Sequence, residues 1–147
     1  MARGMKAGAG ARLAAVDHFH GSPEHQPHGT HPDKDIAASG STLEAFKRNI
    51  AVAGDLIDVH VGSSAEIGAN WREPIRLLFI DGDHSFEASS QDFLVWSSWV
   101  AIHGIVVLHD IGTYEGVTIL YNQVRRDTQH WRQVVRMQSL AVLERLA

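Results

Sequence analysis

The 147-residue chain contains no cysteine. This absence excludes disulfide bonds, thiolate metal ligands and a cysteine nucleophile, and it is typical of a cytoplasmic protein. The sequence also lacks an apolar run long enough to span a bilayer, and residues 1–6 lack the apolar core of a signal peptide. Basic residues are not in excess, since 13 Lys and Arg face 17 Asp and Glu for a net charge of -4. A nucleic-acid partner requires a basic face, so we expect neither a nucleic-acid nor a membrane partner.

The composition is that of a globular protein. Hydrophobic residues make up 44% of the chain and charged residues 20%, which suits one domain with a buried core over residues 1–147. Half of the 10 histidines fall between His18 and His31. They belong to a proline-containing segment, residues 18–40, that we predict to be a long loop or a lid. Its histidines fit either a polar surface or a metal or proton-transfer role.

Two apolar runs end in clusters of ionisable residues. Residues 75–80 are apolar except Arg76, and such a run predicts a strand buried on both faces. Residues 102–108 form a second run. Ligands of open α/β sheets bind at the carboxyl ends of the strands. If the two strands are parallel neighbours, one rim of the sheet carries the polar residues Asp81, Asp83, His84, His109 and Asp110.

Strand and helix patterns alternate along the chain. We predict strands at residues 13–16, 57–61, 75–80, 104–109, 131–137 and 140–146. We predict helices at residues 41–53, 63–70, 85–100 and 114–126. This order is typical of an α/β fold with a parallel sheet and helices on both faces. The last two strands form an antiparallel hairpin that is an unusual addition to the pattern.

The motifs Leu77-Leu78-Phe79-Ile80-Asp81-Gly82-Asp83-His84-Ser85 and Gly104-Ile105-Val106-Val107-Leu108-His109-Asp110, in this order of elements, carry a resemblance. The chain resembles the class I S-adenosylmethionine-dependent methyltransferases, in particular the small-molecule O-methyltransferases related to macrocin and catechol methyltransferases. The resemblance covers residues 11–147 and includes the closing hairpin. It implies a Rossmann-like doubly wound sheet, S-adenosyl-L-methionine as cofactor, and methyl transfer to a hydroxyl of a small molecule.

The N-terminus departs from that family's pattern. The family begins with a strand and a glycine-rich turn, whereas residues 2–10 resemble the end of the helix that follows this turn. Gly8-Ala9-Gly10 is a poor substitute because no strand precedes it. We therefore expect a fold that is incomplete at the N-terminus. A truncated start, a gap filled by a partner segment and an evolutionary remnant remain alternative explanations.

The resemblance implies a set of cofactor-binding residues: Asp17, Ser63, Ser64, Ala65 and Asp81. By resemblance, Asp17 accepts the ribose hydroxyls, and the turn that begins at Ser63 contacts the adenine edge. Each also has a purely structural explanation. Asp17 could be a solvated acid in a turn, and a serine at residue 63 or 64 could be no more than a helix N-cap.

The resemblance also implies chemistry at the polar rim. Asp81, His109 and Asp110 match the positions at which metal-dependent members hold Mg²⁺. Carboxylates suit this ion, whereas His109 replaces the usual acid and favours a softer metal. His84 matches the general base that deprotonates the acceptor hydroxyl. The alternatives are a cluster without a metal and a His84 that only precedes a helix.

Two other functions remain open. The Asp-Gly-Asp-His and His-Asp motifs contain ligand types that metal-dependent hydrolases use. Alternatively, the chain is a truncated, non-catalytic relative that forms a homo-oligomer through an open sheet edge.

Overall fold

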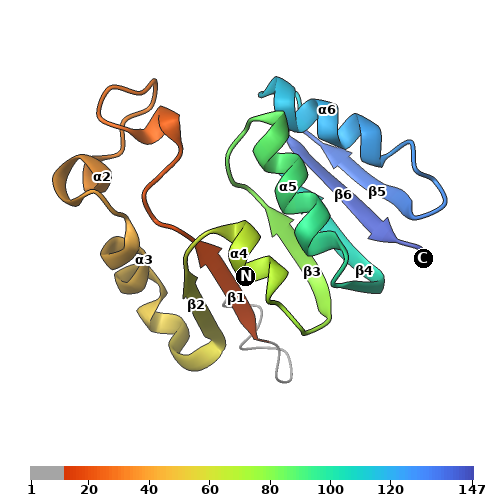
Figure 1. Ribbon diagram of the computed structural model, residues 1–147, viewed down its shortest axis with the longest axis horizontal. Helices are drawn as coiled ribbons and strands as arrows, with labels where there is room; N and C mark the ends of the chain where they lie inside the picture. Colours follow the sequence, from red (N-terminus) through yellow and green to blue (C-terminus); the bar gives the residue numbers. More distant parts are fainter. Residues whose placement is uncertain (1–11) are drawn as a thin grey trace. The chain divides into compact units, whose positions relative to one another are not determined.

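The computed structural model describes residues 12–147, in which strands and helices alternate (Figure 1). The strands are β1 (Leu13–Asp17), β2 (Ile57–Val61), β3 (Ile75–Ile80), β4 (Val100–Leu108), β5 (Trp131–Met137) and β6 (Leu140–Arg145). The α-helices are α2 (Lys34–Ser39), α3 (Leu43–Ile50), α4 (Ser64–Ala69), α5 (Phe86–Ser97) and α6 (Glu115–Val124), and the 3₁₀ helices are η1 (Pro23–His25) and η2 (Ala51–Leu56). None of the helices in this part of the chain is both long and apolar enough to cross a membrane.

The described part of the chain divides after Ile67 into two compact units, unit 1 before this point and unit 2 from Gly68 to Ala147. In unit 1, β1 and β2 form a two-stranded parallel sheet in which Asp17 is the partner of Val61. The predicted strand at residues 57–61 is confirmed. The predictions for residues 2–10, including Gly8-Ala9-Gly10, lie outside the described residues. The single domain over residues 1–147 and its incomplete N-terminus both stay predictions.

The segment at residues 18–40 contains more regular structure than we predicted. It is not a continuous loop, because it includes both η1 and α2. Asp33 starts α2 by accepting hydrogen bonds from the N–H groups of Asp35 and Ile36, at 2.8 and 3.0 Å. The helix ends at Gly40, which adopts the left-handed conformation that glycine tolerates best. The prediction of a loop was wrong here because a capped helix of six residues is too short to show a clear period.

Unit 2 is built on a four-stranded sheet with the order β3-β4-β6-β5. β3 and β4 are parallel, and β6 pairs antiparallel with both β4 and β5. The expected α/β class is therefore confirmed, as is the antiparallel hairpin at the C-terminus.

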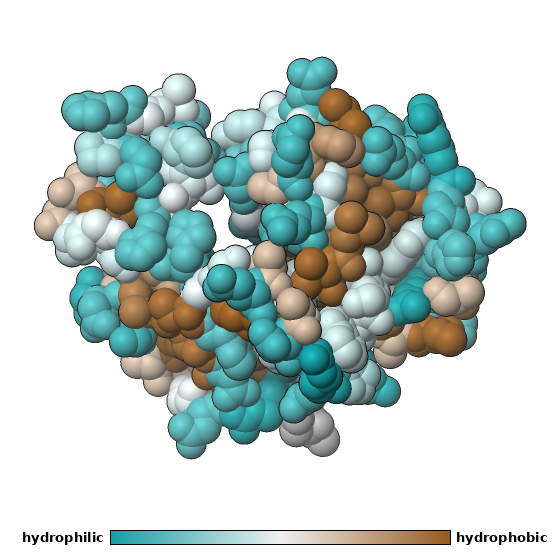
Figure 2. Space-filling view, viewed as in Figure 1, coloured by the Kyte–Doolittle hydropathy of each residue, from teal (hydrophilic) through white to brown (hydrophobic). Residues whose placement is uncertain are grey.

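The helices α5 and α6 lie on one face of this sheet (Figure 1). The helix predicted at residues 114–126 is present as α6, and its residues Val117, Leu120, Tyr121 and Val124 are all buried. They join the core with side chains from α5 and from the same face of β4 and β6. The core therefore sits between one sheet face and these two helices. Some apolar residues around α5 and α6 nevertheless remain exposed in the view of Figure 2.

β3 is not buried on both faces, contrary to prediction. Leu77 and Phe79 are 51% and 39% exposed, whereas Ile80 is buried. Alternate residues of a strand point to opposite faces, and α5 and α6 cover only the face to which Ile80 contributes. The continuous apolar run of β3 therefore does not correspond to burial of both faces of the strand within unit 2.

Candidate active site

The ends of β3 and β4 bring two polar loops to one edge of the sheet in unit 2. Ile80 pairs with Leu108 in the parallel register. The His109 N–H donates a hydrogen bond to the Ile80 carbonyl over 3.1 Å, so the two chains still run side by side where the polar residues begin. The predicted rim is therefore present, with Asp81 following β3 and Asp110 close after β4.

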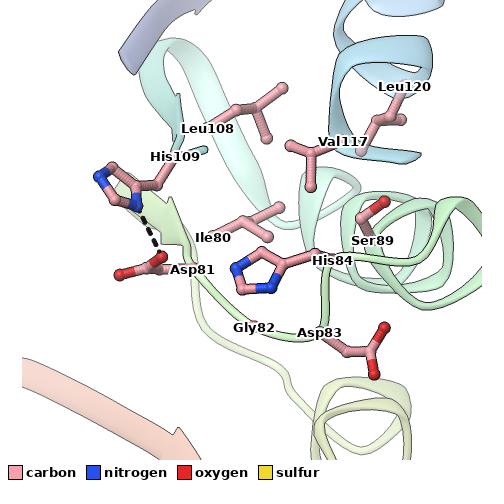
Figure 3. Close-up of a pocket in the computed structure, with 10 residues that line it drawn as sticks. All are labelled: Ile80, Asp81, Gly82, Asp83, His84, Ser89, Leu108, His109, Val117 and Leu120. Carbon is pink, nitrogen blue, oxygen red and sulfur yellow. Dashed lines mark hydrogen bonds and ion pairs between the residues drawn. The ribbon is translucent and has the colours of Figure 1, made fainter. Parts of the chain in front are cut away.

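Two histidine–carboxylate pairs connect these loops. His84 Nε2 lies 2.8 Å from Asp110 Oδ2, and His109 Nδ1 lies 2.9 Å from Asp81 Oδ1 (Figure 3). His109 Nδ1 also lies 3.1 Å from Asp110 Oδ2, so this carboxylate faces both imidazoles. The side chains of His84 and Asp110 are only 17% and 19% exposed. Partial burial strengthens a hydrogen bond between an imidazole and a carboxylate.

Asp110 is held by the backbone of its own turn. Its φ of +61° places it in the left-handed region, which aspartate tolerates better than most residues. The N–H groups of Thr113 and Tyr114 donate to the Asp110 carbonyl over 3.2 and 3.1 Å. The next residue, Ile111, donates its N–H to the carbonyl of Ser139 in the C-terminal hairpin over 3.0 Å. The carboxylate that faces His84 therefore belongs to a turn that these backbone hydrogen bonds hold in place.

His84 lies at the start of α5, in a loop fixed by its neighbours. Asp83 Oδ1 accepts a hydrogen bond from the Ser85 N–H over 2.8 Å. The Ser85 hydroxyl accepts from the Ala88 N–H over 3.2 Å and so caps the start of α5. Hydrogen bonds from Ser85, first from its hydroxyl and then from its N–H, lower the pKa of Asp83 below its usual value. Asp83 is therefore a carboxylate at neutral pH.

The donor atoms at this rim fit a divalent cation. Asp81, His84 and Asp110 each offer one ligand atom, and these atoms lie within 4.8 Å of one another. This group contains His84, whereas the resemblance implied His109 as the third ligand. His109 is close by and contacts both carboxylates through Nδ1. Two carboxylates and an imidazole suit ions from Mg²⁺ to the softer transition metals.

A small pocket that is open to solvent lies beside these residues (Figure 3). Its polar side comes from the loops that follow β3 and β4 and from α5, and its apolar side comes from the two strand ends and from α6. The lining residues are Ile80, Asp81, Gly82, Asp83, His84, Ser89, Leu108, His109, Val117 and Leu120.

The other predicted cofactor residues lie together in unit 1. Asp17 ends β1, and the segment Ser63–Ala65 follows β2 at the same edge of the two-stranded sheet. Asp17 Oδ1 accepts a hydrogen bond from the Phe19 N–H over 2.7 Å, so the carboxylate also stabilises its own turn. The Ser63 carbonyl accepts the Ile67 N–H in the first turn of α4. Their roles in cofactor binding stay predictions.

Sequence reasoning missed Tyr114. Its ring stacks on the imidazole of His84, with ring centroids 3.9 Å apart and planes inclined by 4°. Tyr114 follows Asp110 by four residues, and only the tight turn between them brings it back to His84. No motif in the sequence signals that contact.

Comparison with known proteins agrees with this architecture. Residues 1–111 match a family described as a methyltransferase domain. The O-methyltransferase NovP has a similar structure, with 14% identity, a TM-score of 0.73, and coverage of 99% of this chain and 64% of NovP. The calicheamicin methyltransferase CalS11 gives 15% identity, a TM-score of 0.66, and coverage of 90% and 60%. The O-methyltransferase TomG from Streptomyces achromogenes, in complex with SAM, gives 14% identity, a TM-score of 0.57, and coverage of 92% of this chain and 62% of TomG.

The matched segment covers most of the chain, so this protein belongs to the methyltransferase-domain family. The structural likeness shows that it shares the fold of these enzymes. The chain spans less than two thirds of the length of each of the three proteins.

Proposed function

We propose that this protein transfers a methyl group from S-adenosyl-L-methionine to a hydroxyl of a small molecule. The observation that carries the proposal is the His84–Asp110 pair, placed at the strand ends of a chain that belongs to a methyltransferase family. Two structural neighbours, NovP and TomG, are O-methyltransferases. Family membership favours this activity over the hydrolase that the sequence left open.

His84 is the proposed general base. Its Nε2 faces Asp110 Oδ2 over 2.8 Å, and a neutral imidazole beside a carboxylate can take up the proton of the acceptor hydroxyl. The carboxylate keeps the ring oriented and stabilises the positive charge that the imidazole gains. The deprotonated oxygen is the nucleophile that displacement at a methyl carbon requires, and the remaining task of the protein is to align the two reactants.

The proposed cofactor contacts are Asp17, Ser63, Ser64, Ala65 and Asp81. Asp17 and the Ser63–Ala65 segment meet at one sheet edge, where a carboxylate and a helix start suit a ribose and an adenine edge. TomG is described in complex with SAM, which supports the same cofactor here.

A divalent metal is the proposed aid to this reaction. Asp81 and Asp110 would hold it with an imidazole, either His84 or His109. When bound, such an ion lowers the pKa of a coordinated hydroxyl. A His84→Gln variant separates the two roles of His84, because loss of a base lowers kcat alone, whereas loss of a ligand also weakens Mn²⁺ binding.

The first test is calorimetric titration of the whole chain with S-adenosylhomocysteine, with and without Mg²⁺. We expect micromolar binding, followed by methyl transfer from labelled S-adenosylmethionine to some members of a panel of phenols, catechols and sugar derivatives. The His84→Gln variant should bind S-adenosylhomocysteine and transfer methyl groups about 100-fold more slowly.

His130→Gln is the matched control, since His130 also pairs with a carboxylate, Asp127 at 2.8 Å, but is well exposed and outside the rim. A folded chain that binds no S-adenosylhomocysteine and methylates nothing in the panel would contradict the proposal. So would a His84→Gln variant as active as the control.

A further inference from the structure

Tyr114 touches the proposed base from one side. The two rings lie nearly parallel, with centroids 3.9 Å apart and planes inclined by only 4°. The hydrogen bond from His84 Nε2 to Asp110 has its best geometry when the carboxylate oxygen lies near the imidazole plane. Rotation of the imidazole about χ2 would swing Nε2 away from that oxygen. It would also drive the ring into Tyr114, so the stack opposes this rotation.

Tyr114 does not depend on His84 for its own place. Its N–H donates to the Asp110 carbonyl over 3.1 Å. Its carbonyl accepts from the Thr118 hydroxyl over 2.7 Å, and this hydroxyl in turn accepts from the Gly112 N–H over 2.8 Å. The backbone of Tyr114 is therefore tied to the turn that holds the partner carboxylate. Ring and carboxylate therefore both restrict the position of the imidazole.

The backbone at His84 is held by close packing against the start of α6. A Cβ on Gly116, near the start of α6, would lie 2.4 Å from the His84 carbonyl oxygen and 2.3 Å from the Phe86 nitrogen. The start of α6 therefore packs directly on the loop that carries His84. With its backbone fixed, the side chain of His84 retains mainly its own torsions, and the ring of Tyr114 limits these.

We propose that Tyr114 is a positioning residue, whose aromatic ring keeps the imidazole of His84 in the plane that faces Asp110. This inference rests on the proposed function, in which His84 accepts the proton of the acceptor. The aromatic ring is the required part of Tyr114, and its hydroxyl group is not.

Kinetics of the whole chain test this role. Tyr114→Leu should lower kcat roughly tenfold with little change in either KM, because a base that samples several orientations is less often in place. Tyr114→Phe keeps the ring and should restore kcat to within about twofold. Tyr114→Gln provides a second variant without a ring if the leucine variant does not fold. Trp71→Leu is the control, since it removes another aromatic contact of unit 2, with Trp96.

An equal kcat for the leucine variant and the unaltered chain would overturn the inference. So would a phenylalanine variant as slow as the leucine variant, which would assign the role to the hydroxyl. A rise in the acceptor KM alone would make Tyr114 a substrate contact instead.

NMR gives a readout that needs no activity. In histidine-labelled protein at one fixed pH, the His84 ring signals, assigned by their loss in His84→Gln, should carry a ring-current shift. Tyr114→Leu should remove this shift and move the Nε2 resonance, whereas Tyr114→Phe should preserve both. If the unaltered chain methylates nothing, the proposed function fails and this experiment alone decides the positioning role. Unchanged His84 signals in Tyr114→Leu would then overturn it.

Discussion

Asp110 is the residue on which both histidines of the rim converge. It lies 2.8 Å from His84 Nε2 and 3.1 Å from His109 Nδ1, at a backbone conformation that its own turn maintains. A single carboxylate can therefore orient the base and also offer an oxygen to a cation. A substitution at this residue should affect catalysis more than stability.

We predict that Asp110→Asn lowers kcat on the order of 100-fold. The amide keeps the shape of the side chain, but it removes the negative charge that stabilises a protonated His84. The measurement is methyl transfer at saturating S-adenosylmethionine. Asp127→Asn is the control, because Asp127 pairs with His130 at an exposed position. Equal kcat values for the two variants would rule out this role for Asp110.

A second prediction concerns Asp83 and acid stability. Its hydrogen bonds from Ser85 lower its pKa in the folded protein, whereas an unfolded aspartate has a pKa of about 3.9. The stabilisation is therefore present above about pH 4 and is lost as the pH falls through the folded pKa. Asp83→Asn should lower the free energy of unfolding at pH 7 by about 0.5–1 kcal/mol, after allowance for partial exposure.

Urea unfolding at a series of pH values measures this effect. The difference between Asp83→Asn and the unaltered chain should shrink below pH 4. A difference that is constant from pH 7 to pH 3 would show that the charge of Asp83 is not involved.

At the scale of elements, the contact between α6 and the loop before α5 shapes the rim. Gly116 allows this contact because its missing Cβ would meet backbone atoms at 2.3 and 2.4 Å, and backbone cannot move aside easily. We predict that Gly116→Ala lowers the free energy of unfolding by about 1–3 kcal/mol. Denaturant unfolding measures it, with the exposed Gln123→Ala on the same helix as control. A stability equal to that of the control would mean that α6 shifts at little cost.

The helices and strands were predicted well from the sequence where the hydrophobic pattern extends over enough residues to be recognised. The strands at residues 57–61 and 75–80 and the helix α6 follow the predictions closely. The prediction that β3 is buried on both faces was wrong, because a run of apolar residues does not indicate how many faces of a strand are covered. The helix α2 was missed because it has only six residues.

The site was predictable to a similar extent. Strand ends could be recognised from the sequence, and parallel neighbours had to bring Asp81 and Asp110 to one edge. The exact pairing of each histidine with a carboxylate depends on side-chain torsions and could not be predicted. The stack of Tyr114 on His84 depends on the turn at Asp110, and nothing in the spacing alone specifies that turn.

At the scale of the whole molecule, the buried core is unevenly divided between the units. The core cluster of the described residues draws its members from unit 2 alone, between its sheet and the helices α5 and α6. Described residues of unit 1 contribute three strongly buried apolar side chains, Phe19, Ile36 and Ala53. Because burial of apolar surface is the main stabilising term in folding, unit 2 should open less readily than unit 1.

We therefore predict that amide hydrogens exchange more slowly in β4 and β6 than in β1 and β2. Local opening with few buried apolar contacts costs less free energy, so it exposes the amides of unit 1 more often. Hydrogen exchange followed by mass spectrometry or NMR, expressed as protection factors, removes the effect of intrinsic exchange rates. The measurement is repeated at two pH values, and protection factors that agree show that exchange reports the equilibrium opening of the structure. Equal protection in both sheets would contradict the prediction and would mean that the two units open together as one cooperative structure.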